Sequence, residues 1–442
     1  MRLHMTLIEF RHRWLRGALV AGLTLGAVVV SGLPADGQEE APPLPEDKIV
    51  VDIDAPDEDV FRIGVPDLIG LAKQHTVNGG AVLQNDFRLM PGFRVIGPKS
   101  VRHDYVGLGL GVDLGAWAIL GANGVIKGQV FGNDAALSVE LRFYQSSGGE
   151  VPVLRRTYRG PTTELRKWMH AFANEVIGIV TGTYGPFGTE IAFARKHGPG
   201  HKSVYAAAMD GYGVRKVSSG RGVSMLPTFG KGAIWYTRMT DQGTFITNTR
   251  IGGKRVIGGK GITMAPAICG ERMYFSSSRS GNYEIYSSNL DGKGLRRLTR
   301  SRGIDVSPTC GPGGKLAFVS NRHGSPQVFT MKNDGTNVQR VTFRGNHNQT
   351  PVWCPDPKQP LIAFSGRDQN FDVFTVNLET QKYQRLTQGQ GDNKDPAFSP
   401  DCRLIAFSSN RRGSPGVYLS GQDGLDQNQV INGTAETVRW AR

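Results

Sequence analysis

A short motif recurs six times through the second half of the chain: an apolar residue, then a small or aromatic residue, then an aromatic residue. The final aromatics of successive copies lie 43, 39, 43, 46 and 43 residues apart. A second apolar–aromatic pair follows about ten residues after most copies, and four repeats contain an Asp-Gly turn. Four short strands in each repeat of this length are typical of a β-propeller blade. The six copies are Ile191-Ala-Phe193, Ile234-Trp-Tyr236, Met273-Tyr-Phe275, Leu316-Ala-Phe318, Ile362-Ala-Phe364 and Ile405-Ala-Phe407.

The count of inner strands predicts how the array ends. Five motif copies are preceded by a proline-led strand, whereas nothing of this kind precedes the first copy. The chain ends with Thr437-Val-Arg-Trp440 in the register of the missing strand, so Val438 and Trp440 should complete the first blade. We therefore predict a six-bladed β-propeller over residues 186–442, closed by the C-terminal strand. The alternative, an open all-β array, would leave a sheet edge at each end. The prolines are Pro227, Pro266, Pro308, Pro351 and Pro396.

Composition agrees with a turn-rich β architecture, because 59 of the 442 residues are glycine. The net charge of +14 is unevenly distributed. Residues 36–185 carry 14 basic and 19 acidic residues, whereas residues 186–442 carry 34 basic and 18 acidic residues. The basic side chains are scattered singly over turns rather than gathered in one patch, so we do not expect nucleic-acid binding.

The N-terminus has the pattern of a signal peptide. Four arginines precede an apolar run at residues 18–30, and small residues follow it. The run is shorter than the ~20 residues that span a bilayer, although an uncleaved anchor is the alternative. Residues 1–35 are therefore predicted to direct export, leaving a soluble protein in an oxidising compartment.

Residues 36–60 are expected to form an acidic, flexible lead. Between residues 34 and 59 there are ten acidic residues, five prolines and one lysine. Within this lead, Ile49, Val51 and Ile53 alternate as in a β-strand. This strand is either a pairing edge for a partner or the first strand of the next domain.

Residues 61–185 mix strand and helix signals and predict a small α/β domain. Strands are expected at residues 61–65, 125–131 and 138–144. Residues 163–180 place apolar side chains at helical spacing, with Thr162 or Thr163 as the N-cap and Gly182 as the stop.

Motifs of enzymes and metal sites are missing from the sequence. It has no Gly-x-Ser-x-Gly elbow, no His-Glu-x-x-His pair and no phosphate-binding loop. His197 and His201 flank Gly-Pro-Gly and indicate a solvated turn rather than a metal pair. The four cysteines fall one per repeat: they are either buried thiols or two neighbouring-blade disulfides, 269 with 310 and 354 with 402. We expect no cofactor and no structural metal.

A propeller without catalytic groups usually binds a partner at its axial mouth, where loops from all blades converge. Here the residues just ahead of each proline are mostly polar and differ between repeats, unlike the framework. A rival hypothesis is an exported hydrolase or lyase in which His347 and Asp395 act as base and acid. The candidate mouth residues are Asp305, His347, Asn348, Gln349, Asn393 and Asp395.

Several segments of this chain resemble the TolB family of the Tol-Pal envelope system. The most specific are WAILGANGVIKGQV at residues 117–130, HAFANEV at residues 170–176 and Gly185-Pro-Phe187 leading into the first motif copy. The resemblance implies a non-enzymatic periplasmic adaptor whose propeller mouth binds the peptidoglycan-associated lipoprotein Pal. It further implies that Ile49, Val51 and Ile53 engage TolA. The expected roles are outer-membrane integrity, envelope constriction at cell division and colicin import.

Overall fold

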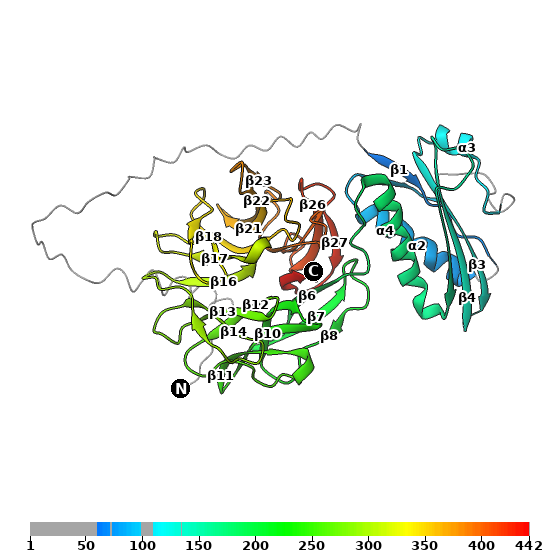
Figure 1. Cartoon of the computed structure of the whole chain (residues 1–442). Helices are drawn as coiled ribbons and strands as arrows, with labels where there is room; N and C mark the ends of the chain where they lie inside the picture. The colour runs from blue at the N-terminus through cyan, green and yellow to red at the C-terminus, as the bar shows by residue number, and fades with distance from the viewer. Residues whose placement is uncertain (1–59, 71–72, 99–108, 134, 442) are drawn as a thin grey trace, which may run out of the picture.

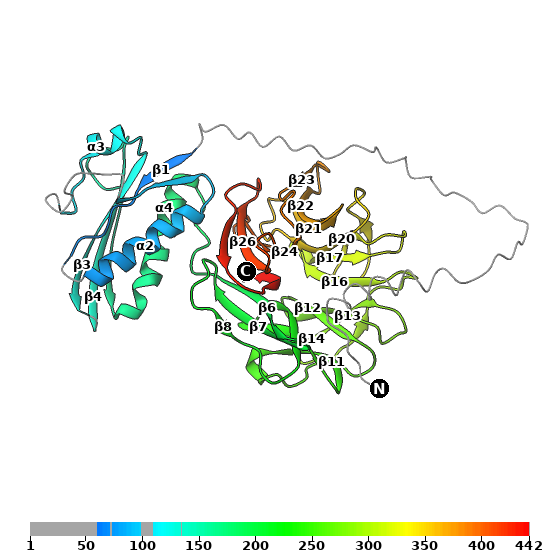
Figure 2. The same cartoon turned by 180° about the vertical axis from the view of Figure 1, so that it is seen from behind.

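The structure, a computed structural model, describes residues 60–70, 73–98, 109–133 and 135–441. An α/β region lies beside a larger β-rich region (Figures 1 and 2). The predicted signal peptide, the acidic lead and the strand at residues 49–53 lie outside the described residues. Within the described part of the chain, no helix combines the length and apolar character needed to cross a lipid bilayer.

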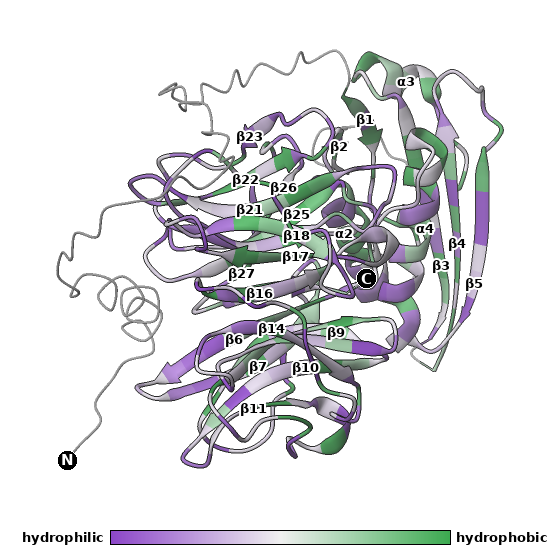
Figure 3. Cartoon of the chain, turned by 60° about the vertical axis from the view of Figure 1, so that its left-hand side comes forward, coloured by the Kyte–Doolittle hydropathy of each residue, from purple (hydrophilic) through white to green (hydrophobic). Residues whose placement is uncertain are grey.

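The α/β region is a five-stranded sheet in the order β2-β1-β3-β4-β5. Strand β1 pairs in parallel with β2 and β3, and the other two ladders are antiparallel. Helices α2 and α4 cover the face nearer the β-rich region (Figure 1), and hydrophobic and hydrophilic bands alternate along β3, β4 and β5 (Figure 3). The elements are β1 (Phe61–Gly64), α2 (Lys73–Leu89), β2 (Phe93–Ile96), α3 (Leu114–Ile119), β3 (Gly124–Asn133), β4 (Ala136–Gln145), β5 (Leu154–Gly160) and α4 (Leu165–Thr181).

The three expected strands are present as β1, β3 and β4, and the expected helix is α4. Gly182 ends α4 in a left-handed conformation with φ 78°, as predicted. The predicted threonine N-cap is wrong, because Thr162 and Thr163 belong to a preceding 3-10 turn and Glu164 caps α4 without a side-chain bond. Helix α2 was not predicted, because its buried positions include two glycines and several polar residues.

The β-rich region contains four four-stranded sheets and one seven-stranded sheet among the described residues. The seven-stranded sheet holds β6 (Glu190–Gly198), β7 (His201–Ala208), β8 (Arg215–Lys216), β9 (Val223–Gly230), β10 (Ala233–Thr240), β11 (Gly243–Asn248) and β28 (Glu436–Trp440). The next two sheets hold β12 (Thr263–Cys269), β13 (Arg272–Ser277), β14 (Glu284–Asn289) and β15 (Arg296–Arg297), then β16 (Asp305–Cys310), β17 (Lys315–Ser320), β18 (Gln327–Lys332) and β19 (Gln339–Arg340). The last two hold β20 (Asn348–Trp353), β21 (Leu361–Arg367), β22 (Phe371–Asn377) and β23 (Tyr383–Arg385), then β24 (Asn393–Phe398), β25 (Leu404–Ser409), β26 (Gly416–Gly421) and β27 (Asn428–Ile431).

The repeated prolines lie inside the inner strands rather than at their start. In β16, β20 and β24 the proline is the fourth residue, and the register of each strand shifts around it. A bulge accommodates a residue that has no N–H to donate. Consequently, three residues expected in loops ahead of the prolines are strand residues that pair with the neighbouring strand: Asp305, Asn348 and Asn393.

The C-terminal strand pairs with the first motif strand, as the strand count predicted. Strand β28 runs antiparallel to β6, with Arg439 opposite Ala192 and Trp440 opposite Ile191. The indole Nε1 of Trp440 donates to Thr189 Oγ1 at 2.8 Å, and the side chain is buried.

All four cysteines form disulfides between adjacent sheets. Cys269 pairs with Cys310, and Cys354 pairs with Cys402. Of the two alternatives left open by sequence, the neighbouring-blade pairing is therefore the one observed.

Candidate functional site

A cavity of about 90 Å³ opens where the first residues of several inner strands converge. Its walls are largely apolar on the side of β9 and β12, where two methionines and two prolines line it. On the side of β20 the lining includes His347, Gln349 and Thr350. The cavity thus offers an apolar surface with a polar border, which suits contact with a protein side chain or a short segment.

One residue with positive φ stands in each of the six inner strands. Their φ angles lie between 50° and 57°, a range that residues with a Cβ rarely adopt. Hydroxyls of the preceding sheet hold three of them: the N–H groups of Ala265, Ser307 and Asp395 donate to Thr237, Ser276 and Ser365 at 2.9 to 3.0 Å. The bulges are therefore fixed by bonds between sheets. The six residues are Leu226, Ala265, Ser307, Thr350, Asp395 and Thr437.

Among the six predicted mouth residues, His347 and Gln349 are the two with accessible side chains. Both are half-buried, and both line the cavity. His347 Nε2 lies 3.3 Å from Gln349 Oε1, and the imidazole packs edge-on against Phe371 with ring centroids 5.4 Å apart. These contacts orient two polar groups that can each donate or accept a hydrogen bond.

Asp305, Asn348 and Asn393 are buried and occupy one equivalent position in successive sheets. Asn348 Nδ2 donates to Gln327 Oε1 at 2.7 Å, and Asn393 Nδ2 donates to Asp372 Oδ1 at 3.1 Å. These bonds connect each inner strand to the preceding sheet. The sequence carried a signal for this framework role, because each of the three residues stands three positions before its proline.

Arginines complete this network from within each sheet. Arg322 pairs with Asp305 at 3.0 Å, and Arg411 Nη2 donates to Asn393 Oδ1 at 3.0 Å. Burial raises the pKa of Asp305, and the nearby Ser320 hydroxyl and Arg322 guanidinium offset that effect only in part.

Asp395 joins the last two inner strands. Its carboxylate accepts the N–H of Thr437 at 2.9 Å, and only 2% of the residue is exposed. The carboxyl group therefore serves the contact between β24 and β28. This position does not favour the rival hypothesis that Asp395 acts as a catalytic acid beside His347.

Charged groups border the same end of the inner strands. Lys394 Nζ lies 2.7 Å from Asp392 Oδ2, and Lys202 pairs with Glu436. Burial alone would raise the pKa of Asp392, but bonds from Lys394 and the Phe371 N–H lower it overall.

One group of described residues has the composition of a metal site, away from the cavity. Potential ligand atoms of Asp86, His170 and Asp210 lie within 4.8 Å of one another between α2, α4 and the turn after β7. Arg166 forms an ion pair with Asp210 and so already supplies a positive charge there. We therefore interpret the group as a polar contact between the two regions.

Comparisons with known proteins agree with this architecture. The family described as TolB beta propeller domain matches residues 178–370 and 347–440. The Tol-Pal system protein TolB of Desulfosudis oleivorans is 36% identical over 209 residues, covering 46% of this chain and 47% of that protein. A protein TolB homolog of Chlorobium luteolum is 29% identical over 208 residues, with the same two coverages. The chain thus spans about half the length of the curated relatives it matches.

A solved structure extends the likeness to both regions of the chain. The crystal structure of TolB from Acinetobacter baumannii has a TM-score of 0.75 and 21% sequence identity. The match covers 86% of this chain and 96% of that one. At this identity the likeness concerns the fold.

Proposed function

The chain belongs to the TolB family, and from that premise we propose that it is a non-enzymatic adaptor of the Tol-Pal system. In this role the protein acts in the periplasm, in support of outer-membrane integrity and of envelope constriction at cell division. This role requires two binding interactions. The cavity at the inner strands binds the lipoprotein Pal, and the segment at residues 49–53 binds TolA.

The proposed scaffold is a six-bladed propeller closed by β28, over residues 186–442. The seven-stranded sheet supports six blades because its two halves meet at a single parallel pair, Lys202 with Val223. Dividing the sheet there leaves β28, β6, β7 and β8 in one blade and β9, β10 and β11 in the next. The proposed boundary between residues 185 and 186 falls between α4 and β6.

The cavity is the observation that supports lipoprotein binding. Gln349 lines it from β20 and His347 from the position just before that strand, and both present polar groups next to apolar walls. We assign direct contact to these two side chains. The buried Asp305, Asn348, Asn393 and Asp395 hold the inner strands that shape the cavity.

This assignment is tested by the double substitution His347→Ala with Gln349→Ala. Side chains at the centre of an interface often contribute about 2 kcal/mol or more, so we expect binding of purified Pal to weaken at least ~30-fold by calorimetry. The matched control is Lys315→Ala with Lys332→Ala. These exposed lysines pair at the end of β17 and β18 that lies away from Asp305.

The control should bind Pal with the wild-type dissociation constant. An unchanged constant for the His347 and Gln349 double variant would show that the contact lies elsewhere. Asn393→Ala is expected to lower thermal stability as well as affinity, which separates a framework residue from a contact residue.

A further inference from the structure

The two regions meet at the segment that follows α4, and this segment is held from both sides. On the α4 side, Asn174 Nδ2 donates to Phe187 O at 2.9 Å and Asn174 Oδ1 accepts the Phe187 N–H at 3.1 Å. Gly185 lies so close that a Cβ there would be 2.5 Å from Asn174 Oδ1. The segment therefore has a single defined path along the helix.

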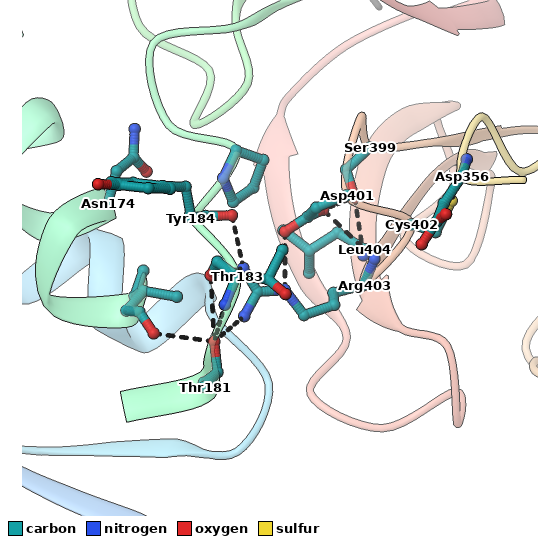
Figure 4. Close-up of polar contacts among 12 residues, drawn as sticks. Asn174, Thr181, Thr183, Tyr184, Asp356, Ser399, Asp401, Cys402, Arg403 and Leu404 are labelled. Carbon is teal, nitrogen blue, oxygen red and sulfur yellow. Dashed lines mark hydrogen bonds and ion pairs between the residues drawn. The ribbon is translucent and has the colours of Figure 1, made fainter. Parts of the chain in front are cut away.

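On the propeller side, one arginine binds the same segment (Figure 4). Arg403 donates to Thr181 Oγ1 at 2.8 Å, to Thr183 O at 2.9 Å and to Tyr184 O at 2.8 Å. These acceptors stand at and just beyond the C-terminus of α4, where the helix dipole favours a cation. Arg403 thus acts as a latch between the two regions.

The latch is oriented by the turn between β24 and β25. Asp401 Oδ2 accepts from Arg403 Nε at 2.8 Å, so the two terminal nitrogens of the guanidinium remain directed at the segment after α4. Ser399 in turn hydrogen-bonds to Asp401 Oδ1 at 2.5 Å. The conformation of this turn therefore sets the direction in which Arg403 points.

Cys402 lies between Asp401 and Arg403, and its backbone has a strained conformation. Its φ is 62°, a left-handed conformation that a residue with a Cβ adopts only under constraint. It is fully buried and is cross-linked to Cys354, which follows β20 in the adjacent sheet. The disulfide is thus a covalent constraint on the strained position beside the latch.

We propose that the Cys354–Cys402 disulfide positions Arg403 against the segment after α4, so that forming this cross-link completes the docking of the α/β region on the propeller. In forming it, the two thiols give up two protons and two electrons to a disulfide-bearing oxidant, which leaves as its dithiol. The latch consequently closes only in an oxidising environment. This proposal is independent of any partner of the protein.

Proteolysis at Tyr184 provides a direct readout, because Tyr184 is 67% exposed and its carbonyl is a latch acceptor. Chymotrypsin cleaves after tyrosine, and cleavage requires the segment to leave its path. Cys354→Ser with Cys402→Ser should raise the initial rate of this cut about tenfold, as should Arg403→Gln. The variant that combines Cys354→Ser, Cys402→Ser and Arg403→Gln should be cleaved no faster than the disulfide variant or Arg403→Gln alone, because both changes release the same contact.

The second disulfide supplies the matched control. Cys269 and Cys310 have a Cα–Cα distance of 5.7 Å, against 5.6 Å for Cys354 and Cys402, and the sequence separations are 41 and 48. Cys269→Ser with Cys310→Ser should lower overall stability to a similar degree but leave the rate of cleavage after Tyr184 unchanged. The proposal would be overturned if cleavage after Tyr184 became equally faster in both disulfide variants. It would also be overturned if cleavage became no faster in the Cys354→Ser/Cys402→Ser variant.

Two further experiments test the proposal if the Cys354→Ser/Cys402→Ser variant folds poorly. Cys354→Ala with Cys402→Gly should cleave at the wild-type rate, since glycine adopts positive φ without strain. The Cys269→Ser/Cys310→Ser protein can also be refolded under reductant and then oxidised with glutathione disulfide. Oxidation should slow cleavage about tenfold in that protein and not in its Arg403→Gln derivative; equal slowing in both would refute the latch.

Discussion

Asp86 is a fully buried carboxyl group at the junction of the two regions. His170 Nδ1 lies 2.8 Å from Asp86 Oδ2, and Arg166, one turn earlier on α4, pairs with Asp210 of the propeller. Burial raises the pKa of Asp86, although the hydrogen bond and charge of His170 and the charge of Arg166 act in the opposite direction. The folded protein therefore holds the proton of this carboxyl group to a higher pH than an exposed aspartate does.

This retained proton predicts how stability at the junction depends on pH. A group whose pKa is raised on folding contributes its stabilisation below the unfolded pKa and loses it as pH rises through the folded pKa. Asparagine cannot ionise, so the Tm of wild type minus that of Asp86→Asn should decrease as the pH rises above about 4, the ordinary pKa of an aspartate. Asp241→Asn, at an exposed turn, is the control that removes a carboxylate elsewhere on the surface. If the difference in Tm between wild type and Asp86→Asn does not change with pH, the pKa of Asp86 is not raised on folding.

Among the elements, β28 has the largest role in the proposed ring. It is a short strand at the end of the described chain, yet it pairs with β6 and contacts β24 through the bond from Thr437 to Asp395. Val438 is fully buried and Trp440 is 5% exposed. Without this strand, β6 would become an open sheet edge of the kind that promotes aggregation.

Removal of residues 430–442 should therefore lower the Tm clearly and increase aggregation. The loss includes burial of an aromatic side chain worth roughly 3 kcal/mol, in addition to the edge pairing. Scanning calorimetry and light scattering measure the two effects. Deletion of residues 36–47 should leave both quantities unchanged. If the C-terminal deletion melts like the full-length protein, closure by β28 and the blade count are wrong.

At the scale of the whole molecule, charge is divided between the parts of the chain. The acidic excess lies ahead of residue 186 and the basic excess lies in the propeller. The alternating segment at residues 49–53 stands within the acidic lead, just before β1. A short alternating strand can add to the exposed sheet edge of a partner through main-chain hydrogen bonds.

Truncation of the lead should separate the two proposed interactions. Removing residues 36–54 is expected to abolish capture of TolA and to leave the dissociation constant for Pal unchanged, since the cavity is formed by the propeller alone. Surface plasmon resonance with each purified partner measures both. Undiminished TolA capture by the truncated protein would rule out this segment as the binding site.

The candidate site shows where reasoning from sequence reaches its limit. Polar residues ahead of each proline were readily found, but their roles differ because the inner strands begin three residues before the proline. Neighbouring side chains of a strand point to opposite sides, so Gln349 faces the cavity while Asn348 bonds to Gln327 of the adjacent sheet. His347, which directly precedes the strand, also lines the cavity. The position of the bulge, which sequence did not predict, decided this division.

The sequence by itself determined the repeat, the strands around each aromatic, helix α4 and the pairing of the last strand with the first motif strand. These features follow from local periodicity, turn residues and the number of strands, all of which can be read directly from the order of residues. Only the tertiary structure decided that the cysteines pair, that Asp395 serves a strand contact and that Arg403 reaches the end of α4. Those contacts join residues up to 222 positions apart, so they depend on how the sheets pack and leave no pattern in the local sequence.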